Sequence, residues 1–174
     1  AKFFYNLGYV YQCRGDKQIA KSFLEQALRL QPDDERTLNG LAAIAYQQND
    51  MTTAIEYYKR AVQAKPDYAE AHYNLGLLFL KLQKYHEAKI QFRNVVKLEP
   101  ENYQALIYLA TLYLFHDKVR LALHYFSKAL EINSKDADLH NNIGVCYLRQ
   151  KKYDAAAIEF ERAMEIEPQH DESR

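Results

Sequence analysis

Residues 70–100, EAHYNLGLLFLKLQKYHEAKIQFRNVVKLEP, contain two apolar-rich runs and end in a proline. Within each run the apolar residues recur at spacings of three and four, which is typical of a helix with one buried face. Proline disfavours helical backbone at the residue before it, so the second helix is expected to end near Leu98. The stretch therefore predicts two helices joined by a short turn, with a polar Asn74 in the apolar part of the first helix.

The same pattern returns along the chain at intervals of 34 residues, as the spacing of Pro32 and Pro66 shows. Proline fills this position in four of the five units, and Ser134 fills it in the other. One position holds alanine in every unit: Ala20, Ala54, Ala88, Ala122 and Ala156. A regular interval of this length indicates a repeat protein. We expect a single domain over 1–170, with repeats at 1–34, 35–68, 69–102, 103–136 and 137–170, and a tail at 171–174.

Small residues are expected where the two helices of a unit cross. In the first unit Gly8 and Ala20 take these positions, and a larger Leu24 lies one turn further along. Later units carry an aromatic residue in place of Leu24, such as Phe92. Small residues let two backbones approach closely, and a large side chain fills the space beside the contact.

The turn between the two helices should need left-handed backbone. The residue at this point is, in order, Gly15, Asn49, Gln83, Asp117 and Lys151. Glycine adopts this conformation freely and Asn and Asp tolerate it, whereas Gln83 and Lys151 suit it less well, so those two turns are expected to be built differently. Asp67 with Glu70 is predicted to cap the first helix of the third unit.

These positions resemble the signature of the tetratricopeptide repeat family over essentially the whole chain. The residues that carry the resemblance are Phe4, Leu7, Gly8, Tyr11, Ala20, Ala27 and Pro32 of the first unit, with aromatics such as Phe92 later. The resemblance implies an all-α fold, a right-handed α-solenoid or superhelix of five antiparallel helix-turn-helix repeats. In such a fold the first helices line a concave groove and the second helices form the outer wall.

The groove residues follow from helix geometry. If positions 4, 7, 8 and 11 of a repeat are buried, positions 2, 5, 6, 9, 12 and 13 are free to face the groove. We expect binding contacts from Lys2, Tyr5, Asn6, Tyr9, Arg36, Asn39, Gly40, Tyr46, Tyr73, Asn74, Lys81, Tyr108, Asn141, Asn142 and Arg149.

The residue types on this face favour a peptide ligand. Asn6, Asn74 and Asn142 share one repeat position, and an amide can both donate to and accept from a peptide backbone. Tyrosines offer rigid contact area with a polar tip, although packing between neighbouring helices is the competing interpretation. For Gly40 two interpretations stay open, namely room for a bulky ligand side chain and close helix packing.

We therefore expect a non-enzymatic scaffold that binds a peptide or protein segment. One alternative is the substrate-recruiting arm of a larger enzyme, because the asparagine series is similar to the ladder in the superhelical arm of O-GlcNAc transferase. Another is an assembly or adaptor subunit of a bacterial secretion, pilus or organelle machinery. The family's carboxylate clamp for chaperone tails is not expected, because the matching positions hold Tyr5, Tyr9, Gly40, Glu70 and Asn74.

Composition argues against other classes. Lys+Arg and Asp+Glu number 23 each, so net charge predicts no attraction to nucleic acid. No apolar stretch reaches the roughly 20 residues that span a bilayer, so no membrane insertion is expected. The sequence has no glycine-rich phosphate loop, CxxC or HExxH, which predicts neither catalysis nor a cofactor or metal site. Cys13 and Cys146 are expected to be free thiols, which fits a cytoplasmic location.

The ends of the chain carry apolar residues without an evident cover. The chain starts at Ala1 inside a helical pattern, so we expect a segment of a longer array. Phe3 and Val10 at one end, and Met164 and Ile166 at the other, favour either further repeats or self-association through the ends.

Overall fold

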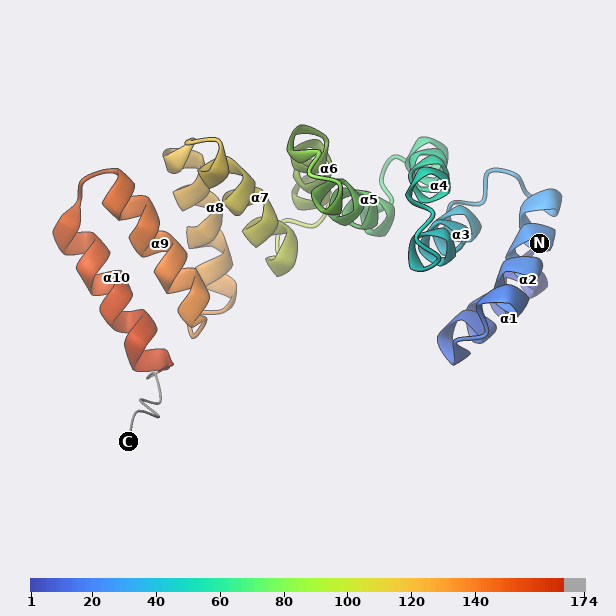
Figure 1. Cartoon of the computed structure of the whole chain (residues 1–174), viewed down its shortest axis with the longest axis horizontal. Helices are drawn as coiled ribbons and strands as arrows, with labels where there is room; N and C mark the ends of the chain where they lie inside the picture. Colours follow the sequence, from blue (N-terminus) through green and yellow to red (C-terminus); the bar gives the residue numbers. More distant parts are fainter. Residues whose placement is uncertain (168–174) are drawn as a thin grey trace. The chain divides into compact units, whose positions relative to one another are not determined.

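The computed structural model describes residues 1–167, and in that range every regular element is an α-helix (Figure 1). The helices are α1 (Lys2–Arg14), α2 (Lys17–Leu30), α3 (Glu35–Gln47), α4 (Met51–Ala64), α5 (Ala69–Lys81), α6 (Tyr85–Leu98), α7 (Tyr103–Phe115), α8 (Val119–Ile132), α9 (Ala137–Arg149) and α10 (Tyr153–Ile166). The predicted all-α helical-repeat fold is confirmed. The end of the fifth predicted repeat, at 168–170, and the predicted tail at 171–174 lie outside the described residues.

The chain divides into two compact units, residues 1–94 and the residues from 95 onward. In the first unit α1 lies against α2 and α3 against α4, while α2 also contacts α3 and α4 also contacts α5. In the second unit α7 lies against α8, α9 against α10, and α8 against α9.

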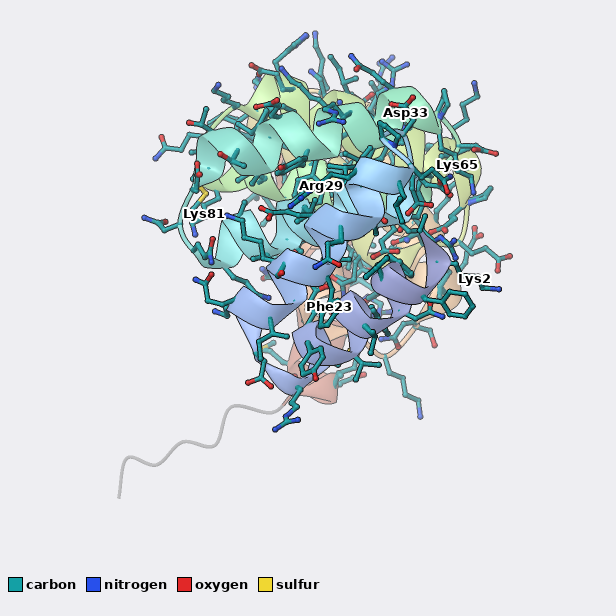
Figure 2. The ribbon with its side chains drawn as sticks, turned by 90° about the vertical axis from the view of Figure 1, so that its right-hand side faces the viewer. Lys2, Phe23, Arg29, Asp33, Lys65 and Lys81 are labelled. Atoms are coloured by element: carbon teal, nitrogen blue, oxygen red, sulfur yellow. The ribbon has the colours of Figure 1, made fainter. Side chains whose placement is uncertain are left out.

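Close approach of the two helices in a repeat depends on a small residue facing a large one. A methyl group at Gly76 would lie 3.0 Å from Cζ of Phe92, and one at Gly144 would lie 2.6 Å from Cε1 of Phe160. Phe23 projects from α2 toward α1, and its ring stacks on Tyr11 with centroids 5.6 Å apart (Figure 2). The predicted pairing of small and large residues is therefore confirmed.

Both units bury apolar side chains between these helices. Buried clusters in the first unit include one formed by Ala20, Leu24, Leu41 and Ile44. A larger cluster in the second unit comprises Leu106, Ala110, Leu114, Ala122, Phe126, Ala129, Leu139, Ile143 and Cys146. Burial raises the pKa of the Cys146 thiol to about 11.

The second helix of the third repeat ends at Leu98 as predicted, and the second helices of the other repeats end at the same repeat position. The last residues are Leu30, Ala64, Leu98, Ile132 and Ile166. α8 ends at this point although Ser134 replaces proline, and the Asn133 side chain there accepts a hydrogen bond from the Lys135 amide at 3.2 Å. Local side-chain bonding to the backbone thus accompanies the helix end where proline is missing.

The prediction that the turns at Gln83 and Lys151 are built differently is wrong. All five turn residues are left-handed, with φ of 91°, 63°, 57°, 55° and 60° at Gly15, Asn49, Gln83, Asp117 and Lys151. The Lys84 amide donates to the Phe79 carbonyl at 2.8 Å, and the other turns repeat this bond. The helix pair fixes the turn geometry, because the same bond must close the end of each first helix.

The predicted cap at Asp67 is also wrong. The N-cap of α5 is Tyr68, and its side chain does not cap the helix. The counterparts of Tyr68 in other repeats do cap, since Asp34, Asn102 and Asp136 each accept from a backbone amide three residues later. A phenol at this position is too long to fold back onto the first turn, so its hydroxyl bonds elsewhere.

Some apolar side chains of the first and last helices are exposed. Phe3 is 84% exposed and Val10 58%, whereas Leu139 and Ile44, at the same repeat positions, are covered by the preceding second helix. On α10, Met164 is 58% exposed, while Phe160, Ala163 and Ile166 are partly buried.

The turn geometry predicts that Gln83→Gly and Lys151→Gly stabilise the protein by about 0.5–1 kcal/mol each, because left-handed backbone is costly for side chains with a Cβ. Urea unfolding followed by helical circular dichroism measures the change. Glu56→Gly, at an exposed position in the middle of α4, is the control and should destabilise by about 1 kcal/mol. Equal destabilisation by all three substitutions would contradict this account of the turns.

Candidate functional site

The predicted binding residues of the first unit lie on α1, α3 and α5, and we call them the first-helix face. Six are exposed: Lys2, Asn6, Tyr9, Arg36, Tyr46 and Lys81. Four are partly buried: Tyr5, Gly40, Tyr73 and Asn74. Asn39 is buried, with 7% of its surface exposed.

Aromatic and cationic side chains connect α1 to α3. The rings of Tyr5 and Tyr9 stack with centroids 6.3 Å apart, and the guanidinium carbon of Arg36 lies 5.0 Å from the centre of the Tyr5 ring. Burial raises the pKa of the Tyr5 hydroxyl, and the Arg36 charge partly offsets this effect. A cation over an aromatic face is attracted by the negative potential of that face. Arg36 and Tyr5 therefore place a positive charge and an aromatic ring next to each other on this face.

A second pair of this kind connects α3 to α5. The Lys81 ammonium nitrogen lies 4.6 Å from the centre of the Tyr46 ring. Tyr73 packs differently, with its ring edge-on to the buried Phe92 ring at 5.9 Å. Tyr73 therefore contributes to packing, whereas Tyr46 lies on the surface, where contact with a ligand stays a prediction.

A hydrogen-bond network joins α3 to α5 next to these rings. The Asn39 amide nitrogen donates to Glu70 Oε1 at 2.9 Å, and the Asn74 amide nitrogen donates to Asn39 Oδ1 at 3.2 Å. The Tyr68 hydroxyl donates to Glu70 Oε2 at 2.9 Å. Burial and the Glu70 carboxylate raise the pKa of that hydroxyl. Asn39 therefore uses both ends of its amide inside the protein and fixes the orientation of Asn74.

Tyr68 is a member of this network that sequence reasoning missed. The available signal was its repeat position, where the other repeats carry the capping residues Asp34, Asn102 and Asp136. A tyrosine there cannot serve as the cap, so its hydroxyl reaches Glu70 instead.

Gly40 lies close to a neighbouring repeat. A methyl group at this position would lie 3.1 Å from Cδ1 of Leu24, on α2. Close packing between the repeats is therefore a sufficient reason for the glycine, and a role in admitting a ligand side chain stays a prediction.

In the second unit the predicted residues are Tyr108, Asn141, Asn142 and Arg149. Asn141 is exposed and Asn142 partly buried, as is Tyr108. Arg149 donates to the Leu114 carbonyl at 2.9 Å and lies 3.4 Å from an Asp117 carboxylate oxygen. Arg149 thus donates to a carbonyl at the end of α7, which stabilises that helix end. This structural role accounts for Arg149 without a ligand.

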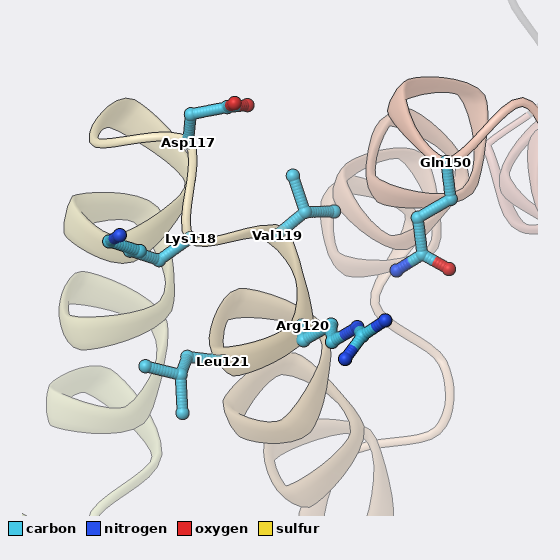
Figure 3. A pocket seen from close by; sticks show the side chains of 6 residues that line it. All are labelled: Asp117, Lys118, Val119, Arg120, Leu121 and Gln150. Carbon is cyan, nitrogen blue, oxygen red and sulfur yellow. The ribbon is translucent and has the colours of Figure 1, made fainter.

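A hollow of about 350 Å³ lies beside this contact, where the α7–α8 turn meets the end of α9. Figure 3 shows that Val119, Arg120 and Gln150 border it, with Asp117 at the turn. It combines cationic, anionic and apolar groups, so its lining alone indicates no ligand class.

The histidines of the described residues do not form a metal site. His72 and His140 are buried, with 6% and 5% of their surface exposed. His72 contacts Gln91 and the Pro66 carbonyl, and His140 contacts Glu159 and the Ser134 carbonyl. Across residues 1–167, no three His, Cys, Asp or Glu side chains gather in a way that could hold a metal ion.

Helix pairs of constant length with the same turn and crossing contacts define an all-α helical-repeat protein. The family model described as TPR repeat matches residues 43–83. Two family models described as Tetratricopeptide repeat match residues 109–171 and residues 1–34 and 69–102. The chain belongs to the tetratricopeptide repeat family.

A curated relative is the peroxisomal targeting signal receptor of Saccharomyces cerevisiae. It is 35% identical over 71 residues, which make up 41% of this chain and 12% of that protein. The matched stretch therefore spans only a small part of the relative's length.

Several solved structures share the fold. MamA is 23% identical with a TM-score of 0.81, covering 93% of this chain and 95% of its own. MamA from Desulfovibrio magneticus RS-1 is 22% identical with a TM-score of 0.80, covering 98% and 96%. YrrB, described as a TPR protein with an unusual peptide-binding site, is 20% identical with a TM-score of 0.85, covering 96% and 86%.

None of the helices in residues 1–167 combines the length and the apolarity that a membrane span requires.

The network predicts that Asn39→Ala destabilises the protein by about 1–2 kcal/mol, because Glu70 and Asn74 each lose a partner. The measurement is the free energy of unfolding in urea. Asn6→Ala removes an exposed amide from the same face and should change stability by less than about 0.5 kcal/mol. Similar decreases in the free energy of unfolding for the two variants would show that the hydrogen bonds of Asn39 do not stabilise the protein.

Proposed function

We propose that this chain is a non-enzymatic scaffold that binds a peptide or protein segment along its first helices. Membership of the tetratricopeptide repeat family favours an interaction module over a catalyst. The described peptide-binding site of YrrB and the targeting-signal receptor among the relatives point in the same direction.

The observation that carries the proposal is the orientation of Asn74. Among the described residues its side chain has one hydrogen bond, to Asn39, which holds the amide in one position. The amide oxygen is then available to accept from a peptide N–H, and the second amide hydrogen can be donated to a peptide carbonyl. Asn6 and Asn142 occupy the same repeat position, so they would offer the same chemistry in the first and fifth repeats.

The tyrosines would supply the apolar part of the contact. Tyr9 and Tyr46 are exposed, and Tyr5 and Tyr46 each lie under a cation. A tyrosine loses little conformational entropy on binding and presents a large surface with a polar tip. Tyr108 would play this part in the second unit.

The charges of the first-helix face favour an acidic segment. Lys2, Arg36 and Lys81 are exposed, while the Glu70 carboxylate is already bonded to Asn39 and Tyr68. Complementary charge increases the rate of encounter and the preference among partners.

Two other settings would use the same face. The chain would be the substrate-recruiting arm of an enzyme if a catalytic domain belongs to the same protein. It would be an assembly or adaptor subunit if it links components of a larger machinery. In each case the binding step is the one proposed here, so the same experiment tests it.

The test is a pull-down that compares the wild-type chain with an Asn6→Ala, Asn74→Ala, Asn142→Ala variant. A partner that binds through its backbone should be captured about tenfold or more weakly by the variant, because each lost hydrogen bond costs about 1 kcal/mol. Helical circular dichroism must be the same for both proteins.

The matched control carries three polar-to-alanine changes on second helices, Gln18→Ala, Ser22→Ala and Ser127→Ala. These side chains are exposed on α2 and α8, so capture should be unchanged. Capture that survives the asparagine variant but not the control would reverse the proposal and place the ligand on the second helices.

A further inference from the structure

Two positions of the repeat change together along the chain. On the first helix the residue is, in order, Phe4, Leu38, His72, Leu106 and His140. On the second helix it is Phe23, Tyr57, Gln91, Tyr125 and Glu159. An apolar residue on the first helix therefore accompanies an aromatic ring on the second, and histidine accompanies a carboxamide or carboxylate.

The two kinds of pair make different contacts. The rings of Phe4 and Phe23 stack with centroids 6.4 Å apart. His72 Nδ1 lies 2.7 Å from Gln91 Oε1, and its Nε2 lies 3.0 Å from the Pro66 carbonyl. The polar pair directs the second-helix side chain toward the histidine rather than over the apolar core.

In the second repeat the aromatic member covers the space between repeats. Tyr57 packs against the buried cluster that includes Leu24 and Leu41, and against a second cluster that includes Leu38. Its ring therefore covers apolar side chains between α2 and the following helix pair.

The hollow beside Tyr57, of about 400 Å³, has neither Leu41 nor Ala45 in its lining. In the third repeat Gln91 takes the position of that ring, and the hollow there, of about 420 Å³, extends to the counterparts of these two residues. Leu75 is the counterpart of Leu41 and lines the hollow together with Phe79. Its other apolar residues are Ile55 and Val62 on α4 and Ile90 on α6. Pockets of this volume are typical of small-ligand and side-chain sites.

The charged residues of the hollow favour a negatively charged ligand. Lys59 and Lys84 are exposed, and Glu87 is the single anion among the lining residues. One end of the Gln91 amide contacts His72 Nδ1, so the other end remains to form a hydrogen bond with a polar tip inside the hollow.

We propose that this hollow, formed by α4, α5 and α6, binds an aromatic side chain of a partner segment that carries acidic residues beside it. The aromatic ring would take the place that Tyr57 takes in the second repeat, and the acidic neighbours would face Lys59 and Lys84. A tyrosine fits best, because its hydroxyl can both donate and accept and so can bond the end of the Gln91 amide that does not contact His72. This site is separate from the first-helix face and does not depend on the function proposed above.

The probe is the capped pentapeptide Glu-Glu-Tyr-Glu-Glu, titrated into the ¹⁵N-labelled chain. The amide resonances of residues 55–63, 75–79 and 84–91 should shift and saturate. Glu-Glu-Ala-Glu-Glu and Lys-Lys-Tyr-Lys-Lys should bind about tenfold more weakly, because one lacks the ring and the other repels the lysines.

Two variants make the test specific. His72→Leu with Gln91→Tyr copies the Leu38 and Tyr57 pair, fills the hollow, and should reduce affinity by about tenfold or more. Lys59→Glu with Lys84→Glu changes exposed residues only, so the fold is retained while the acidic peptide binds about tenfold more weakly.

The asparagine triple variant of the first-helix face separates this site from the proposed function. It should bind the pentapeptide as the wild type does. The inference is overturned if no shifts appear at millimolar peptide, if the shifts fall on α1 and α3, or if neither paired variant lowers the affinity.

Discussion

The contact on which this fold depends is the crossing of two helices at a small residue. Gly76 and Gly144 leave room for an aromatic ring that a methyl group would press against. The alanines of the second helices are fully buried at this crossing, as Ala20 and Ala88 illustrate. Because the contact is local and recurs every repeat, each helix pair can be built from its own 34 residues and from its neighbours. The five left-handed turns follow from it, since the crossing fixes where the chain must reverse.

Much of this fold can be predicted from sequence because the period is unbroken. The helix ends, the small-to-large pairing and the burial of His72 all follow from repeat position. The turns at Gln83 and Lys151 were mispredicted, because residue preference is weaker than the geometry imposed by two packed helices. The cap at Asp67 was mispredicted because a local motif was weighed above the repeat register.

The candidate site was harder to predict, since side-chain contacts between repeats leave little trace in one sequence. The helical stripe placed Asn39 among ligand contacts, yet both ends of its amide bond Glu70 and Asn74. Arg149 lies on the same predicted stripe and bonds a carbonyl of α7. Both residues belong to the first helices as expected, but the partners that they contact depend on distances between repeats that spacing alone does not define.

The most direct test of the central claim is site-specific photocrosslinking of the partner captured by the chain. A benzoylphenylalanine would replace Tyr9 on the first-helix face or Ser22 on α2 of the same repeat, both of which are exposed. The account predicts that the partner crosslinks to the chain modified at Tyr9 and not to the chain modified at Ser22. Crosslinking at Ser22 alone would contradict binding along the first helices.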